Sequence, residues 1–153
     1  NMGPLNGAKS TTLEGGIRVP LIMRWPNKIK PGITSNQVCA TFDLTRSILN
    51  LAQAKVPNEQ LDGVDIAEHV CARKPDFART LFWRGKRGER TWAAVRQGDL
   101  KYVRKTEGET QEWLFDLSKD LGEKINLSSA KPREFALLKR LFADWEKNLK
   151  PVR

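Results

Sequence analysis

Short apolar segments separated by glycine-containing turns dominate the second half of the chain. Each segment alternates apolar and polar positions, or runs apolar for a few residues, as half-buried or buried strands do. The predicted strands are Thr80–Arg84, Thr91–Arg96, Leu100–Lys105 and Gln111–Leu117. Gly98 and Gly108 lie between strands and can supply the positive φ that hairpin turns often need. Consecutive strands with tight turns predict an antiparallel four-stranded meander.

The last predicted element is a helix over Pro132–Leu149, and Pro132 suits its first turn. Its apolar side chains recur at spacings of three and four residues. This stripe consists of Phe135, Leu138, Leu141, Phe142, Trp145 and Leu149. Because such a stripe is more often a packing face than a cofactor site, we expect the helix to cover one face of the meander. The predicted fold class is therefore α+β, a small antiparallel sheet packed by a C-terminal helix.

The first half of the chain predicts one strand and one helix. Residues 17–25 form a nearly continuous apolar run, which suits a strand buried on both faces. Pro20 places that strand at a sheet edge or a bulge. Residues 41–54 have apolar positions near helical spacing and predict a helix whose N-terminus Thr41 or Asp43 can cap.

Length and composition predict a folded chain. It has 153 residues, of which 39% are hydrophobic, enough for a compact domain with a modest core. No apolar run approaches the roughly 20 residues of a membrane span, and no signal-peptide pattern is visible. Cys39 and Cys71 are isolated and form no metal-binding pattern. We expect two buried free thiols, although the spacing leaves a disulfide open.

The net charge of +9 favours a polyanionic partner, either nucleic acid or a sulfated glycan. A solvated basic surface would explain the same charge, because the basic residues are spread along the chain and only residues 84–90 are densely basic. No nucleic-acid recognition motif is present, so we expect neither a nucleic-acid nor a membrane partner.

Residues 1–16 are rich in Gly, Ser and Thr and predict a loop with Lys9 near its centre. The small neighbours of Lys9 would let an anion approach the backbone, and their hydroxyls add hydrogen-bond donors. An ammonium in such a loop is a plausible oxyanion site. The spacing does not fit a Walker phosphate loop.

The stretch from Gly3 to Pro20, GPLNGAKSTTLEGGIRVP, resembles the second signature segment of the sulfatases, roughly G-P-L-R-G-x-K-x-T-x-x-E-G-G-x-R-x-P. Further similarities follow in the family's order. They lie at Trp25–Ile29, Asp43–Ala52, Leu61–Val64, Ala94–Tyr102 and Leu114–Leu127. Because the matches cover nearly the whole chain, the sequence looks like the C-terminal part of a sulfatase.

The resemblance implies a fold and a division of the chain. Sulfatases have a large α/β domain related to alkaline phosphatase and a small C-terminal domain with a four-stranded antiparallel sheet and a helix. Residues 1–56 would then be the end of the large domain, with its last strand and helix. Residues 57–79 would connect it to the C-terminal subdomain, residues 80–153.

The resemblance also implies sulfate ester hydrolysis by a formylglycine nucleophile, with a calcium ion that polarises the sulfate. Lys9 matches the lysine that binds sulfate oxygens, and it is the one catalytic residue carried over. The nucleophile motif C/S-x-P-S-R does not occur in this sequence. We therefore expect the calcium ligands and the nucleophile to lie outside this chain, and the chain alone to be inactive with no cofactor bound.

Other candidate residues carry less specific signals. The start of the C-terminal domain often lines the active-site mouth in this family, which makes four residues of the basic loop candidates for substrate binding. They are Trp83, Arg84, Lys86 and Arg87, and the alternative is a solvated hairpin. Glu14 is expected to anchor its loop through backbone amides or Arg18. His69 is interpreted as a surface or interdomain histidine rather than a catalytic one.

Two positions depart from the family pattern. Asn6 stands where Arg is usual and Ser10 where Gly is usual. Since the arginine normally braces the loop, Lys9 is expected to be mobile and exposed in the isolated chain.

The prediction is the C-terminal part of an arylsulfatase-like or N-acetylgalactosamine-6-sulfatase-like enzyme acting on sulfated carbohydrates. The family implies a periplasmic, secreted or lysosomal location for the parent protein. One alternative is a non-catalytic domain that binds sulfated glycans or other polyanions through Lys9 and residues 84–90. Another is a nucleic-acid binder, on charge alone. An apolar strand at 17–25 without neighbours would also favour pairing with a second copy.

Overall fold

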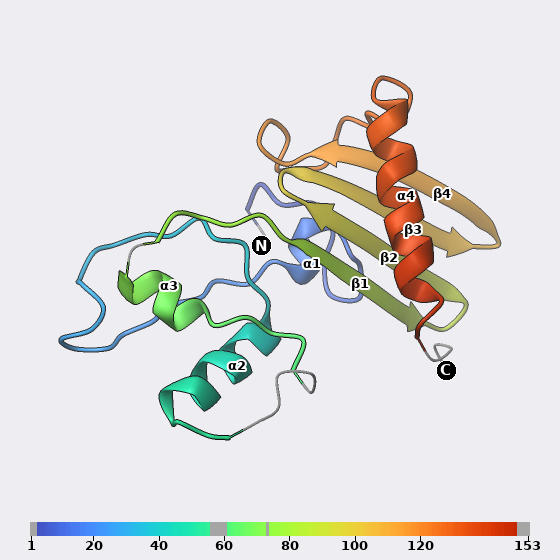
Figure 1. Cartoon of the computed structure of the whole chain (residues 1–153). Helices are drawn as coiled ribbons and strands as arrows, with labels where there is room; N and C mark the ends of the chain where they lie inside the picture. The colour runs from blue at the N-terminus through green and yellow to red at the C-terminus, as the bar shows by residue number, and fades with distance from the viewer. Residues whose placement is uncertain (1–2, 56–60, 73, 150–153) are drawn as a thin grey trace. The chain divides into compact units, whose positions relative to one another are not determined.

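The computed structural model describes residues 3–55, 61–72 and 74–149 (Figure 1). The chain forms two compact units, Asn1–Pro20 with Ala78–Arg153, and Leu21–Phe77. We call them the sheet unit and the helix-pair unit. The lysine loop, which we define as residues 7–12, therefore belongs to the same unit as the sheet.

The sheet unit contains the predicted four-stranded antiparallel meander. Its strands are β1 (Thr80–Arg87), β2 (Arg90–Gln97), β3 (Leu100–Glu107) and β4 (Glu109–Asp116), and they pair in the order β1-β2-β3-β4. The strands run further than predicted because pairing continues to the edge of each turn, as in Gln97↔Leu100. Gly98 and Gly108 have φ values of 59° and 71°, so both predicted turn glycines adopt the left-handed conformation.

Helix α4 (Pro132–Glu146) covers one face of the sheet, as predicted (Figure 1). Leu138 and Phe142 are buried against Val95, Tyr102 and other sheet residues. Burial of each large apolar side chain contributes about 1.5–3 kcal/mol. The helix ends at Glu146, earlier than the predicted Leu149. Trp145, in its last turn, stacks on the ring of Phe82 with the ring centroids 4.9 Å apart.

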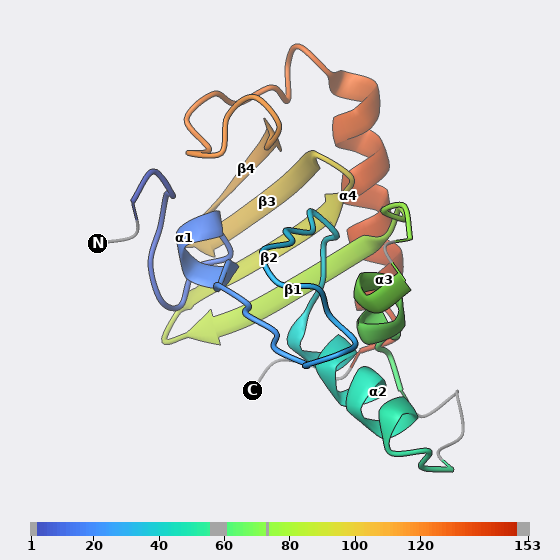
Figure 2. The same cartoon turned by 90° about the vertical axis from the view of Figure 1, so that its left-hand side faces the viewer.

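The opposite face of the sheet is covered by the N-terminal segment and the short helix α1 (Glu14–Ile17), as Figure 2 shows. This loop face has its own apolar cluster, in which the side chain of Leu13 packs against sheet residues. The cluster comprises Trp92, Ala94, Val103, Phe115 and Leu117, flanked by Leu13, Trp83 and Trp113. Strand alternation therefore gives the meander two buried faces.

The strand predicted at 17–25 is not present. Ile17 closes α1, and residues 18–25 carry no strand structure. Val19 is 68% exposed and Ile22 is 92% exposed. An extended segment becomes a strand only when a neighbour pairs with its backbone, and no described segment pairs with this one. The apolar run thus leaves several large side chains in contact with solvent.

The helix-pair unit contains α2 (Thr41–Leu51) and α3 (Ile66–Ala72). The predicted helix at 41–54 is confirmed, but the N-cap residue is Ala40 rather than Thr41 or Asp43. Asp43 lies at the third helical position and its Oδ2 accepts a hydrogen bond from the Ala40 N–H at 2.6 Å. Its carboxylate thus satisfies a free backbone donor at the helix start. Among the described residues, no helix is long and apolar enough to cross a membrane.

The turn-side carboxylate of Glu107 provides a test of the sheet geometry. Hydrogen bonds from Arg90, at 2.7 and 2.9 Å, and from Lys105 lower the pKa of Glu107 to about 2. We expect an NMR titration to give that pKa, and Arg90→Ala to raise it toward the ordinary 4.5. Because the folded pKa lies below the unfolded one, the stabilisation is present above about 4.5 and is lost as the pH falls through about 2.

Arg133→Ala is the matched control, since Arg133 is exposed on α4. It should leave the pKa of Glu107 unchanged. An ordinary pKa for Glu107 in the unmodified chain would show that the β3–β4 turn is not as described.

Candidate functional site

Lys9 lies at the exposed tip of the lysine loop. The Thr11 N–H donates to the Ala8 carbonyl at 3.1 Å, which closes a turn around Lys9. No described residue forms an ion pair or hydrogen bond with the Lys9 ammonium. The expected exposure is therefore confirmed, and the ammonium is available to an anion.

Ser10 has the backbone conformation that glycine favours. Its φ of 77° lies in the left-handed region, where glycine is favoured. The family pattern has glycine at this position, and Ser10 adopts the glycine conformation at some cost in backbone energy. Ser10 therefore replaces the usual glycine and keeps the loop conformation at this position.

Gly15 and Gly16 are needed because backbone crosses closely beneath the loop. The Gly15 N–H donates to the Asn6 carbonyl at 2.6 Å. A Cβ on Gly15 would lie 2.5 Å from that carbonyl oxygen, and one on Gly16 would collide with the Thr11 carbonyl. Hence only glycine lets α1 approach the lysine loop this closely.

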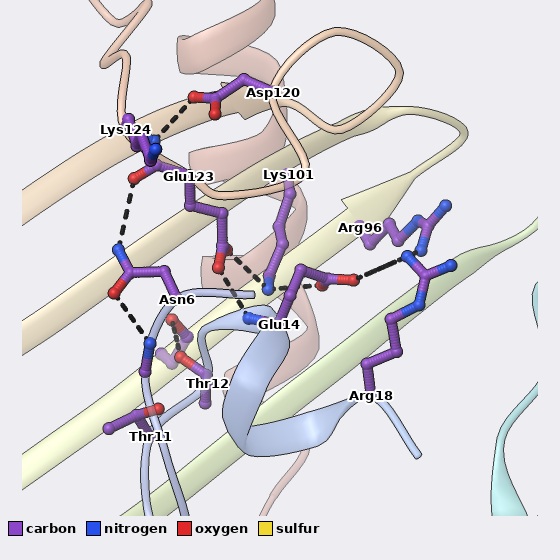
Figure 3. Close-up of polar contacts among 12 residues, drawn as sticks. Asn6, Thr11, Thr12, Glu14, Arg18, Arg96, Lys101, Asp120, Glu123 and Lys124 are labelled. Carbon is purple, nitrogen blue, oxygen red and sulfur yellow. Dashed lines mark hydrogen bonds and ion pairs between the residues drawn. The ribbon is translucent and has the colours of Figure 1, made fainter. Parts of the chain in front are cut away.

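Lys101 is buried between two carboxylates and joins three segments (Figure 3). Its Nζ lies 2.7 Å from Oε1 of Glu14 in α1 and 2.8 Å from Oε1 of Glu123, in the loop after β4. All three side chains are at most 3% exposed. The other oxygen of Glu123 accepts the Glu14 N–H at 2.6 Å. We call these three residues the buried ion network.

Two arginines complete the charge balance around Glu14. Arg18 lies 3.5 Å and Arg96 4.0 Å from its Oε2 (Figure 3). The expectation that Glu14 anchors its loop through Arg18 is confirmed, while its shortest ion-pair contact is with Lys101. Burial raises the pKa of Glu123 above its ordinary value, although the Lys101 ammonium acts in the opposite direction.

Asn6 holds the start of the lysine loop where arginine is usual. Its Oδ1 accepts the Gly7 N–H at 2.7 Å, and its Nδ2 donates to the Glu123 carbonyl at 3.4 Å (Figure 3). A short amide therefore links the loop to the segment that carries Glu123. The loop is braced without the arginine.

The four predicted substrate-binding residues do not form one cluster. Trp83 packs against the apolar cluster of the loop face. Arg84 lies on the opposite face, where its Nη1 is 3.5 Å from Oε1 of Glu146 in α4, and alternation puts Lys86 on that face too. Arg87 returns to the loop face and approaches the Ser10 hydroxyl at 3.4 Å. Arg87 is therefore the one of the four shown beside the lysine loop.

In the helix-pair unit, His69 is buried rather than on the surface, with 6% exposure. Its Nε2 lies 3.3 Å from Asp76 Oδ1, and its ring meets the Phe77 ring edge-on at 5.5 Å. The surface alternative for His69 was thus wrong, because local packing within the unit encloses the ring, and the interdomain alternative stays a prediction. Cys39 and Cys71 are free and half-buried, as thiols and not as a disulfide.

The described residues contain no group of three or more His, Cys, Asp or Glu side chains that could hold a metal ion. The buried carboxylates of Glu14 and Glu123 instead form ion pairs with Lys101, and Glu14 also with Arg18 and Arg96.

The fold and the loop agree with one protein family. The model of the family described as "N-sulphoglucosamine sulphohydrolase, C-terminal" matches residues 8–149. Human arylsulfatase A is 32% identical over 165 residues, covering 91% of this chain and 32% of the human protein. N-acetylgalactosamine-6-sulfatase of the dog, Canis lupus familiaris, is 29% identical over 165 residues, with the same coverages, 91% and 32%.

The crystal structure of Ps i-CgsB in complex with k-i-k-neocarrahexaose superposes with a TM-score of 0.82 and 25% identity, over 94% of this chain and 32% of that one. The chain belongs to the sulfatase family, in its C-terminal domain class. It spans about a third of the length of these relatives.

The sequence reasoning did not identify Lys101 and Glu123 as a buried pair. Both lie within segments that match the family, but neither was given a role. The available signal was a lysine two residues before Val103, a spacing that puts both side chains on the same face of the strand. Identifying its partners required the tertiary structure, because Glu14 lies 87 residues away.

Removing the buried ammonium should destabilise the sheet unit strongly. We expect Lys101→Met to lower the free energy of unfolding by about 3–5 kcal/mol, since it leaves the buried Glu123 carboxylate without a cation and Glu14 with only the more distant Arg18 and Arg96. Urea denaturation measures the change. The matched control, Lys119→Met, removes an exposed lysine and should change stability by less than about 0.5 kcal/mol.

A second variant separates lost charge pairing from lost packing. Glu123→Gln added to Lys101→Met should recover part of the stability, because it removes the carboxylate that Lys101→Met leaves without a cation. Equal stabilities for Lys101→Met and Lys119→Met would rule out the buried ion network.

Proposed function

We propose that this chain is the C-terminal part of an enzyme that hydrolyses sulfate esters of carbohydrates, and that Lys9 binds the oxygens of the sulfate group. The observation that carries the proposal is the exposed Lys9 ammonium on a loop that the glycine pair and the buried ion network position. Membership of the sulfatase family supports it.

In this proposal, the Lys9 ammonium neutralises negative charge on the sulfate oxygens and orients the group for attack. Arg87 lies beside the same loop through its contact with Ser10 and adds positive charge to that surface. The nucleophile belongs to the rest of the enzyme, because this sequence has no C/S-x-P-S-R run. Residues 1–153 alone should therefore release no sulfate.

We further propose a substrate of the N-acetylgalactosamine-6-sulfate type. The similarity to the dog N-acetylgalactosamine-6-sulfatase supports this choice. The Ps i-CgsB structure was solved in complex with k-i-k-neocarrahexaose, which supports a carbohydrate substrate more generally.

The test uses the longer protein encoded at the native locus, assayed for sulfate release from N-acetylgalactosamine-6-sulfate. Lys9→Ala should lower kcat/KM by about 10²–10³-fold, the usual effect of losing one charge-stabilising group. Lys9→Arg should retain part of the activity. Lys139→Ala is the control, since Lys139 contacts Glu112 and the Phe135 ring of α4 on the opposite face of the sheet.

The alternative function is a non-catalytic domain that binds sulfated glycans through the basic loop. The proximity of Arg87 to Ser10 favours it specifically, because two exposed cationic side chains then border one surface. Glycan binding that survives Lys9→Ala and is lost in Arg87→Ala, in a longer protein without sulfatase activity, would support this alternative over the enzyme.

The exposed apolar segment 17–25 predicts self-association of the isolated chain. Val19 and Ile22 present large apolar side chains to solvent, and an extended backbone without neighbours can pair with a second copy. We expect light scattering to show dimers or larger species at high concentration, and Ile22→Lys to reduce them. A monomer at all concentrations would count against pairing through this segment.

A further inference from the structure

A cavity of about 360 Å³ opens on the loop face of the sheet. Its floor consists of aromatic residues from three positions, Trp92 in β2 and Trp113 and Phe115 in β4. Asn6 and Leu13, at the two ends of the segment that carries the lysine loop, line one side. Lys9 does not line it, so the cavity adjoins the base of the lysine loop as a separate space.

The rim of the cavity is polar and basic. Gln111, Asn126 and Lys124 supply amide and ammonium groups. The Lys124 side chain is exposed and has no carboxylate partner among the described residues. Lys105 also lines the cavity but is held at 2.8 Å by Glu107. The Glu123 carboxylate forms its ion pair with Lys101. Lys124 is therefore the cation at this rim that can bind an anionic ligand.

The Trp92 indole leaves one buried polar group without a partner next to the cavity. Trp92 is 9% exposed, and its Nε1–H has no hydrogen-bond acceptor among the described residues. Buried donors in native proteins are almost always paired. Its acceptor is therefore water or a group outside the described residues.

From these observations we propose that the cavity binds a pyranose ring that carries a sulfate group. The half-buried Trp113 ring offers a flat apolar surface to the C–H face of a sugar, above the buried Trp92 and Phe115 rings. The Gln111 amide and the Asn126 amide N–H groups suit its hydroxyls, since the Asn126 Oδ1 already accepts the Leu114 and Ser128 N–H groups. Lys124 suits the sulfate. The size falls within the usual range of small-molecule sites. The cavity is then a second sugar subsite beside the lysine loop, which rests on the proposed function for the sulfated sugar as ligand.

The test follows the five tryptophan indole N–H signals of the chain by NMR during a titration with N-acetylgalactosamine-6-sulfate. The Trp92 and Trp113 signals should shift and saturate, while that of Trp145, on the α4 face, should not. Trp113→Leu should weaken binding about tenfold or more while the chain stays folded, as the unshifted Trp145 indole signal would show, and Trp113→Phe should weaken it less. No saturable shift of Trp92 or Trp113, or full affinity in Trp113→Leu, overturns the proposal.

Charge variants identify the anionic partner. Lys124→Gln should weaken binding of the sulfated sugar and leave binding of unsulfated N-acetylgalactosamine unchanged. Lys119→Gln, a neighbouring exposed lysine outside the cavity, should alter neither. If inorganic sulfate alone reproduces the indole shifts at the same concentration, the site takes an adventitious ion only and the sugar proposal fails.

Lys9→Ala separates this inference from the proposed function. It should leave the indole shifts and the affinity for the cavity intact. Loss of all sugar binding in Lys9→Ala, with no effect of Trp113→Leu, would place the ligand at the lysine loop and overturn the second subsite while supporting the proposed function. Cavity binding without sulfatase activity in the longer protein would instead leave the subsite and contradict the proposed function.

Discussion

The buried ammonium of Lys101 is the contact on which the loop face of the sheet depends. It rises from β3 and meets Glu14 and Glu123, which come from segments far apart in the sequence. A charge removed from water is costly unless opposite charges compensate for it. Lys101 is therefore tolerated only when both segments are docked. The network thereby specifies one arrangement of α1 and the loop after β4.

The lysine loop inherits its position from that arrangement. Glu14 begins α1, and Gly15 and Gly16 follow it at the closest approach of backbone to the loop. The stretch from Lys9 to Glu14 thus contains both an exposed lysine and the carboxylate that binds a buried one. Lys9 is left exposed for an anion, whereas Glu14 is buried to secure Lys101. The packing of Glu14, Gly15 and Gly16 fixes the conformation of the loop, and the Lys9 side chain takes no part in that packing.

Strand alternation divides the chemistry of the sheet between its faces. The α4 face is an aromatic and aliphatic core, and its arginines, such as Arg84, are engaged with Glu146. The loop face combines the ion network, the lysine loop, Arg87 and the aromatic cavity. A continuous basic stretch in the sequence therefore does not become a continuous basic surface, because neighbouring residues of β1 point in opposite directions.

The pattern of the sequence alone determined the meander and its covering helix, because hairpin turns and a helical stripe are local features. It also identified Lys9 as the candidate sulfate ligand, through an ordered family resemblance, and the exposure of that side chain is confirmed. It was wrong about the strand at 17–25, since a strand needs a partner that the apolar pattern cannot supply, and about a surface position for His69, which is enclosed with Phe77 and Asp76.

Only the tertiary structure decided which side chains meet. The pairing of Lys101 with Glu14 joins residues 87 positions apart, and the cavity brings together residues of β2, β3, β4 and two loops. Local patterns specify whether a residue faces inward or outward, but not what it faces. That depends on the register of the strands and on the docking of distant loops, which long-range packing and buried charge fix together.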